Sequence, residues 1–204
     1  MRKPTGEGFV VSMKGVRQLA EFDAVVEGHV RAFFAGHDCE PQVWRAGPMR
    51  ELHPQFRVLE IAPGPRTVLW TYASVGAAIL SQTDAQALEF VLQAPRPDPR
   101  LVEIVTMVAH YNHRHPLGEG HTVPIGGAWL ERSPSDHLLI SKPYPFGPDF
   151  ERIDAPEGQA RVLWLLPITE AERDFKIANG LAALEARFED AGAEYWRPDR
   201  RSVC

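Results

Sequence analysis

The stretch HLLISKPYPFGPDFERIDAPEGQARVLWLLPITEAERDFKIANGLAALEARFEDAG, residues 137–192, decides the fold of this chain. It contains a strand at Leu138–Ser141, a loop of prolines and aromatics, and a strand at Arg161–Leu166 that is apolar enough to be buried on both faces. Thr169-Glu170-Ala171-Glu172 is typical of a capping box, in which the Thr and Glu side chains accept hydrogen bonds from each other's backbone amides. We therefore expect a helix directly after the buried strand.

Further helices and strands are expected on both sides of this stretch. Apolar residues at helical spacing predict a helix over Val16–Phe34, ended by Gly36. Asp98 followed by Pro99 predicts the start of another helix, because Asp caps free amides and Pro suits the first helical position. That helix would end near His115-Pro116, and a last helical face runs from Leu181 to Ala191-Gly192. The other predicted strands are Phe56–Ile61, Thr67–Val75, Leu88–Gln93, His121–Ile125 and Phe150–Ile153, and Pro41–Pro54 is expected to be irregular.

Hairpin-connected strands occur beside strands separated by helices. This mixture favours an α+β fold with a mixed, mostly antiparallel sheet covered by helices. The length of 204 residues fits a single domain over residues 1–204, which begins with an N-terminal helix within residues 1–40. The apolar run Val162–Leu166 is expected at the centre of the sheet.

Charge and composition exclude several classes of protein. The net charge of −5 argues against non-specific nucleic-acid binding, which depends on an excess of Lys and Arg. The local arginine cluster of Arg197, Arg200 and Arg201, which also contains Asp199, is expected to be a solvated tail. The apolar run Val162–Pro167 is too short to cross a membrane. We therefore expect no nucleic-acid or membrane partner.

The N-terminal residues and the cysteines indicate the compartment. Met1-Arg2-Lys3-Pro4 has the charge of a signal sequence, but Thr5-Gly6-Glu7-Gly8 supplies no apolar segment. Cys39 and Cys204 are far apart and do not form a disulfide framework. These features favour a cytoplasmic protein.

Four histidines suggest an alternative function. His110 and His113 would share a helix face and His121 could return from the following loop, so a three-histidine metal site in an enzyme is conceivable. The competing interpretation places His110, His113 and His115 at a helix C-terminus, where imidazoles stabilise the last carbonyl groups. No H-E-x-x-H motif is present, and we expect no metal and no cofactor.

Nucleophilic catalysis has weaker support. Ser74 lacks the glycine two positions earlier that a nucleophile elbow needs. Cys39 lies near His37 and Asp38 in sequence, but neighbouring side chains point apart and do not form a triad. No phosphate-binding glycine motif follows Gly118-Glu119-Gly120.

The loop Lys142-Pro143-Tyr144-Pro145-Phe146-Gly147-Pro148 is the candidate protein-binding site. Its three prolines hold the backbone extended, so Tyr144 and Phe146 could be presented at little entropic cost as interface anchors. The competing interpretation is that both rings fold back onto the core. Asp149 and Glu151 would add a negative field that favours a basic partner, and together with Asp154 and Glu157 they are expected to form a solvated acidic edge.

Several segments resemble the suppressor of fused domain family. Arg66–Gly76, RTVLWTYASVG, is similar to the family's W-x-Y-x-(T/S)-x-G strand, and Ala87–Leu92 is similar to its E-(L/F) strand. Leu117–Pro124, LGEGHTVP, resembles its G-H-T-(I/V)-P segment. The last third, from Trp164 to Arg201-Ser202-Val203, resembles the bacterial stand-alone branch. The resemblance covers residues 45–204, and residues 1–40 are the part that it supports least.

The resemblance implies a non-enzymatic domain that binds another protein. Animal members of the family sequester a transcription factor by gripping a short peptide, and bacterial stand-alone members are thought to neutralise toxins of polymorphic toxin systems. It therefore favours an immunity protein whose partner is a toxin domain. A regulatory binder of a peptide or transcription factor, and the metal-dependent enzyme at His110–His121, remain as alternatives.

Overall fold

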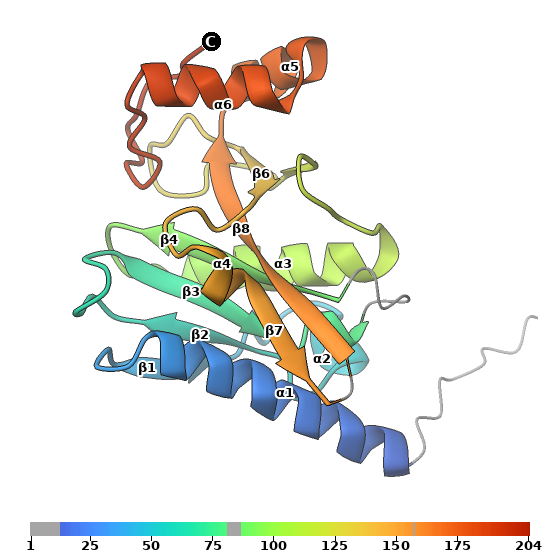
Figure 1. Cartoon of the computed structure of the whole chain (residues 1–204). Coiled ribbons are helices and arrows are strands. Elements are labelled where there is room, and N and C mark those ends of the chain that lie inside the picture. Colours follow the sequence, from blue (N-terminus) through green and yellow to red (C-terminus); the bar gives the residue numbers. More distant parts are fainter. Residues whose placement is uncertain (1–12, 81–86, 157) are drawn as a thin grey trace, which may run out of the picture.

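A single sheet lies at the centre of the computed structural model, which describes residues 13–80, 87–156 and 158–204 (Figure 1). Within those ranges the strands pair in the order β1-β2-β3-β4-β8-β6-β5, and β7 pairs separately with β8. Every pairing is antiparallel except that of β4 with β8, which is parallel. The strands are β1 (Cys39–Gln42), β2 (Arg57–Ile61), β3 (Trp70–Val75), β4 (Leu88–Ala94), β5 (Thr122–Pro124), β6 (His137–Ser141), β7 (Arg152–Ala155) and β8 (Gly158–Ile168).

The long strand β8 holds the two halves of the sheet together. Arg161 in its first half lies opposite Leu88 of β4 on one side and Arg152 of β7 on the other. Trp164, further along, lies between Val91 of β4 and Ser141 of β6. The strands β7 and β6 therefore follow one another along the same side of β8. The chain between them, from β6 to β7, leaves the sheet and forms the proline-aromatic loop.

Helices cover both faces of the sheet (Figure 1). On one face α3 packs its apolar stripe, and on the other face α1 crosses the sheet while α5 and α6 lie past the C-terminal end of β8. Asp98 caps α3 and Thr169 with Glu172 forms the predicted capping box of α5. The described helices are α1 (Met13–Phe33), α2 (Met49–Leu52), α3 (Pro99–Arg114), α4 (Pro148–Glu151), α5 (Glu170–Asn179) and α6 (Leu181–Asp190), with a short 3-10 turn, η1 (Ala78–Leu80).

The core has two parts, one on each face of the sheet. Successive side chains of a strand point to opposite faces, so Leu163 and Leu165 pack with α3 while Val162, Trp164 and Leu166 pack with α1 and α6. All five are buried. The predicted burial of this strand on both faces, and the predicted α+β class with a mixed, mostly antiparallel sheet, are confirmed.

Three local expectations were wrong. The strand predicted over Thr67–Val75 begins only at Trp70. Pro41–Pro54 is not wholly irregular, because it holds the end of β1 and the short helix α2. Phe150 and Glu151 belong to α4, and the strand predicted over Phe150–Ile153 begins only at Arg152. Gly147 has a φ of +77°, which lets the chain reverse, and Pro148 then starts a helical turn.

Candidate protein-binding surface

Backbone hydrogen bonds within the proline-aromatic loop fix its conformation. The amides of Phe146 and Gly147 both donate to the carbonyl of Pro143, at 2.8 and 3.0 Å, and Pro143 itself is buried. The chain then enters α4, whose Phe150 is fully buried in the core. The loop is therefore a fixed part of the fold between β6 and β7.

The two aromatic rings of the loop point to different environments. Phe146 is half-buried and packs edge-on against Phe33, Phe34 and Phe150, with ring centroids 5.0–5.8 Å apart. Tyr144 is 60% exposed, and its hydroxyl lies 3.4 Å from Glu185 of α6. The core-packing interpretation therefore describes Phe146, whereas Tyr144 is the ring that faces solvent.

Tyr144 lies among carboxylates. Partial burial raises the pKa of its hydroxyl, and the negative charges of Glu185, Glu119 and Glu151 raise this pKa further. An exposed ring with acidic neighbours suits contact with a positively charged group, which is attracted by both the ring face and the carboxylates. Glu119 and Glu151 also have cationic neighbours, Lys142 and Arg161, so Glu185 and the exposed Asp149 are the carboxylates that favour a basic partner.

The acidic edge expected next to the loop is only partly free. Asp149 and Asp154 are exposed, but Glu151 pairs with Arg161, with 2.5 Å between Arg161 Nη2 and Glu151 Oε1. Glu119 lies 3.6 Å from Lys142 Nζ and 3.9 Å from Arg161 Nη2. These paired residues line a hollow of about 600 Å³. Glu157 lies outside the described residues.

The clustered histidines do not gather around one point. His113 Nδ1 lies 2.8 Å from the Leu80 carbonyl, and His115 packs against the ring of Tyr111. Across the described ranges, no three His, Cys, Asp or Glu side chains come together in an arrangement that could hold a metal ion. No observation on the described part of the chain therefore favours the three-histidine site of the alternative enzyme.

His37 and Cys39 do not act together as a base and a nucleophile. His37 Nδ1 donates to the Ala62 carbonyl at 2.7 Å and its Nε2 accepts from the Arg66 amide at 3.0 Å, so both ring nitrogens hold the loop between β2 and β3. Burial raises the pKa of the Cys39 thiol, which disfavours the reactive thiolate.

The C-terminal arginines do not form the expected solvated tail. Arg197 is exposed and pairs with Glu194 and Asp199, and Arg201 is also exposed. Arg200 is buried, and its guanidinium binds both carboxylate oxygens of Glu172 at 2.6 and 2.7 Å. It also donates to the Pro167 carbonyl at 2.8 Å. Sequence reasoning missed this pair because a buried Arg and an exposed Arg look alike in a charged segment.

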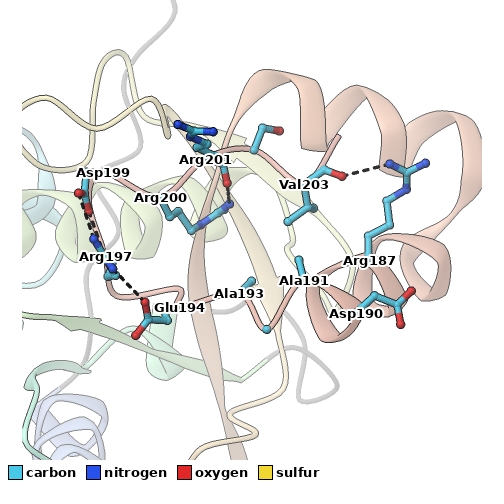
Figure 2. Close-up of a pocket in the computed structure, with 12 residues that line it drawn as sticks. Arg187, Asp190, Ala191, Ala193, Glu194, Arg197, Asp199, Arg200, Arg201 and Val203 are labelled. Carbon is cyan, nitrogen blue, oxygen red and sulfur yellow. Dashed lines mark hydrogen bonds and ion pairs between the residues drawn. The ribbon is translucent and has the colours of Figure 1, made fainter.

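An open polar groove of about 1050 Å³ lies beside this ion pair (Figure 2). Arg187 lines it and donates to the Val203 carbonyl at 3.1 Å. The groove wall also carries Asp190, Glu194 and Asp199, and Arg197 pairs with the last two. The groove is therefore of mixed charge and not an anion-binding site on this geometry.

A buried carboxylate at the other end of the sheet was also missed. Glu89 of β4 accepts hydrogen bonds from the Ser74 hydroxyl and from the amides of Gly76, Ala77 and Ala78, the three amides at 3.0–3.3 Å. Burial raises the pKa of Glu89 to about 7, although these donors and Ser74 act to lower it. The carboxylate thus closes the turn that follows β3.

A second polar contact ties α1 to the sheet next to this turn. Asp23 Oδ2 lies 2.9 Å from His53 Nε2, and both side chains are buried. Glu27, one turn further along α1, binds Arg57 of β2 at 2.5 Å. Gly76 lies against this pair, because a Cβ on Gly76 would come within 2.6 Å of His53 Nε2. The N-terminal helix is therefore an integral layer of the fold.

These contacts explain the sequence motif around β3 and β4. Ser74, Gly76 and Glu89 meet in the buried turn, and the Tyr72 hydroxyl accepts a hydrogen bond from the Asp98 amide at the start of α3. Residues 53–201 match the family described as Suppressor of fused protein (SUFU). The fold and these motif residues define a suppressor of fused domain, and the chain belongs to the suppressor of fused family.

The solved structures place the chain beside a bacterial member of this family. A SUFU homolog from Neisseria gonorrhoeae FA 1090 is 32% identical, with a TM-score of 0.79 over 91% of this chain and 98% of that chain. The Sufu-Fu complex is 13% identical, with a TM-score of 0.63 over 90% and 92% of the two chains. Drosophila Suppressor of Fused is 13% identical, with a TM-score of 0.54, and this chain spans 49% of its length. The last two likenesses show the fold alone.

No curated protein matches the sequence. Among residues 13–80, 87–156 and 158–204, every helix is too short or too polar to cross a membrane.

Proposed function

We propose that this protein is a non-catalytic, cytoplasmic binding domain that neutralises a basic partner protein, and that the partner is a toxin domain of a polymorphic toxin system. The observation that carries the binding role is the exposed ring of Tyr144, which sits on a fixed loop with its hydroxyl 3.4 Å from Glu185. One of the similar solved structures is the Sufu-Fu complex, in which a suppressor of fused protein is bound to a protein partner. The resemblance to the stand-alone bacterial branch supports the immunity role.

The loop residues have different roles in this proposal. Tyr144 contacts the partner, and Phe146 anchors the loop from behind through the rings of Phe33, Phe34 and Phe150. Asp149 and Glu151 contribute negative charge that speeds the encounter with a basic surface. Glu151 forms an ion pair with Arg161, so a change at Glu151 would also break that pair. Asp149 is therefore the better position at which to test the effect of negative charge on binding.

Binding is tested by recovering the partner on tagged protein and measuring its affinity for variants. We expect Tyr144→Ala to weaken binding by at least about 2 kcal/mol, a loss typical of an interface hot spot, without a change in the melting temperature. Asp149→Lys should mainly lower the association rate and its salt dependence. Val68→Ala removes another exposed apolar side chain, 83% exposed, and serves as the matched control.

The possible outcomes test the binding surface and the immunity role separately. If Tyr144→Ala folds and binds with unchanged affinity, the interface lies elsewhere. The immunity role is tested by expressing the recovered partner in cells. Growth arrest that is relieved by the wild-type protein, and less by Tyr144→Ala, supports it. A partner without toxicity would overturn the immunity role and favour the regulatory binder.

A further inference from the structure

A second groove lies on the opposite face of the sheet from the Tyr144 loop. Phe146 packs with the core on the α1 side, whereas Trp44, which lines the groove, packs with the core on the α3 side. The groove has a volume of about 480 Å³ and lies between the end of β1 and the start of α3. Its lining consists of Gln42, Val43, Trp44, Glu60, Pro97, Asp98, Pro99 and Val102.

The walls of the groove are apolar and accessible. Val43 is 47% exposed, Trp44 is half-buried, and Pro97 and Pro99 are exposed. In the described part of the chain, β1 ends the sheet and pairs only with β2, so the groove opens at a sheet edge. Such walls suit an aliphatic stem, and the indole of Trp44 can also attract a cation at its face.

The charge of the groove is of one sign. Glu60 and Asp98 are its only charged lining residues. Asp98 is fixed in place, because its Oδ1 accepts from the Arg100 amide at 2.9 Å and its own amide donates to the Tyr72 hydroxyl at 3.2 Å. Arg100 does not neutralise the groove, since its guanidinium binds Glu103 and the Ile125 carbonyl.

Arginine is the side chain that combines the required properties. Its stem is apolar, its planar guanidinium stacks on aromatic rings, and its five N–H donors reach several acceptors at once. The acceptors here are the carboxylates of Glu60 and Asp98 and the side-chain carbonyl of Gln42. Lysine would offer a compact charge with no plane to stack on Trp44.

We propose that this groove binds an arginine side chain presented by an exposed segment of a partner protein. The stem lies along Trp44, Pro97 and Pro99, and the guanidinium reaches Glu60 and Asp98. The groove acts independently of the Tyr144 surface, because the two lie on opposite faces of the sheet. One partner segment can therefore bind at the Tyr144 surface while another places its arginine in the groove.

The probe is the pentapeptide acetyl-Gly-Ser-Arg-Ser-Gly-amide, titrated into the full chain and followed by NMR at the indole N–H of Trp44, assigned with Trp44→Phe. We expect saturable shifts at this signal. The matched peptide with citrulline in place of arginine keeps the shape but loses the charge, and it should bind at least about tenfold more weakly, ~1.4 kcal/mol.

Variants locate the binding. Glu60→Gln and Asp98→Asn keep the size of each side chain, and Asn still caps a helix, so both should fold while weakening the peptide several-fold. Asp149→Asn, at the Tyr144 surface, should have no effect. Equal binding of the citrulline peptide, absence of a shift at Trp44, or unchanged affinity in Glu60→Gln and Asp98→Asn would each overturn the proposal. None of these results depends on the role of Tyr144.

Discussion

Arg200 and Glu172 form a two-point ion pair that is almost wholly removed from solvent, with side-chain exposures of 6% and 0%. The same carboxylate accepts the amide of Thr169, at the start of α5, and the amide of Val203. One acidic side chain therefore caps a helix, binds the C-terminal segment and neutralises a buried arginine. Burial acts to raise the pKa of Glu172, but Arg200 and these amides hold it below its usual value.

Removal of Arg200 should be strongly destabilising. Arg200→Ala leaves the Glu172 charge buried without its counter-ion, which typically costs about 3–5 kcal/mol. Arg197→Ala is the matched control, because Arg197 pairs with Glu194 and Asp199 on the exposed surface and should change little. Urea denaturation of both variants checks this. Similar midpoints for the two would show that the buried pair contributes no more than the surface pairs.

The pH dependence of stability should carry the signature of Glu89. Its folded-state pKa is raised to about 7 from 4.5, so between these values the folded protein holds a proton that the unfolded chain has released. The contribution of Glu89 to the free energy of unfolding therefore falls as the pH rises from about 4.5 to 7, by up to ~3 kcal/mol.

Glu89→Gln should remove this slope. Its overall stability should be lower, because an amide cannot accept all the bonds that the carboxylate receives from Ser74 and the turn amides. The comparison is of the shapes of the two curves of unfolding free energy against pH. Parallel curves between pH 4.5 and 7 would mean that Glu89 does not titrate there.

Alanine substitutions at the two aromatic residues of the loop should differ in their effect on the stability of the protein. Phe146→Ala removes a ring from a packed aromatic cluster and should cost about 2–4 kcal/mol, near the lower part of the range for core phenylalanines because Phe146 is only half-buried. Tyr144→Ala should change stability by about 0.5 kcal/mol or less. Thermal and urea unfolding measure both. A loss on Tyr144→Ala as large as that on Phe146→Ala would place both rings in the core.

Alanine substitutions at Trp164 and Thr169 should also differ clearly in their effect on the free energy of unfolding. Trp164→Ala empties a site that is 5% exposed at the centre of the sheet and next to the ring of Tyr195, and should cost about 3–5 kcal/mol. Thr169→Ala removes one capping hydroxyl and should cost about 1 kcal/mol. Equally mild effects in denaturation would contradict the placement of β8.

Gly76 should not tolerate a side chain. Its φ is +103°, and a Cβ would meet His53 Nε2 at 2.6 Å, so Gly76→Ala should cost at least about 2 kcal/mol through backbone strain and displacement of the Asp23–His53 pair. Gly28→Ala, within α1 and with open space around its Cβ position, should instead stabilise by about 0.5–1 kcal/mol. Differential scanning calorimetry of the two variants tests this contrast.

The sequence by itself determined the elements whose signals are local. A strand apolar at every position, such as Val162–Leu166, must be covered on both faces, and Thr169 with Glu172 specifies a helix start whatever surrounds it. The order of several short motifs, from Arg66–Gly76 to Arg201-Ser202-Val203, indicated the family, although each motif alone is weak. The position of the loop between two strands was also visible, because prolines cannot continue a hydrogen-bonded ladder.

Only the tertiary structure decided which polar groups are buried and which aromatic faces solvent. Arg200 and Glu172 are 28 residues apart, and Asp23 and His53 are 30 residues apart, so no local pattern indicates that they meet. The burial of Arg200 depends on a counter-charge supplied from another element. Phe146, and not Tyr144, packs among Phe33, Phe34 and Phe150, while Tyr144 is exposed. Such pairings arise from three-dimensional proximity, which the linear sequence does not encode locally.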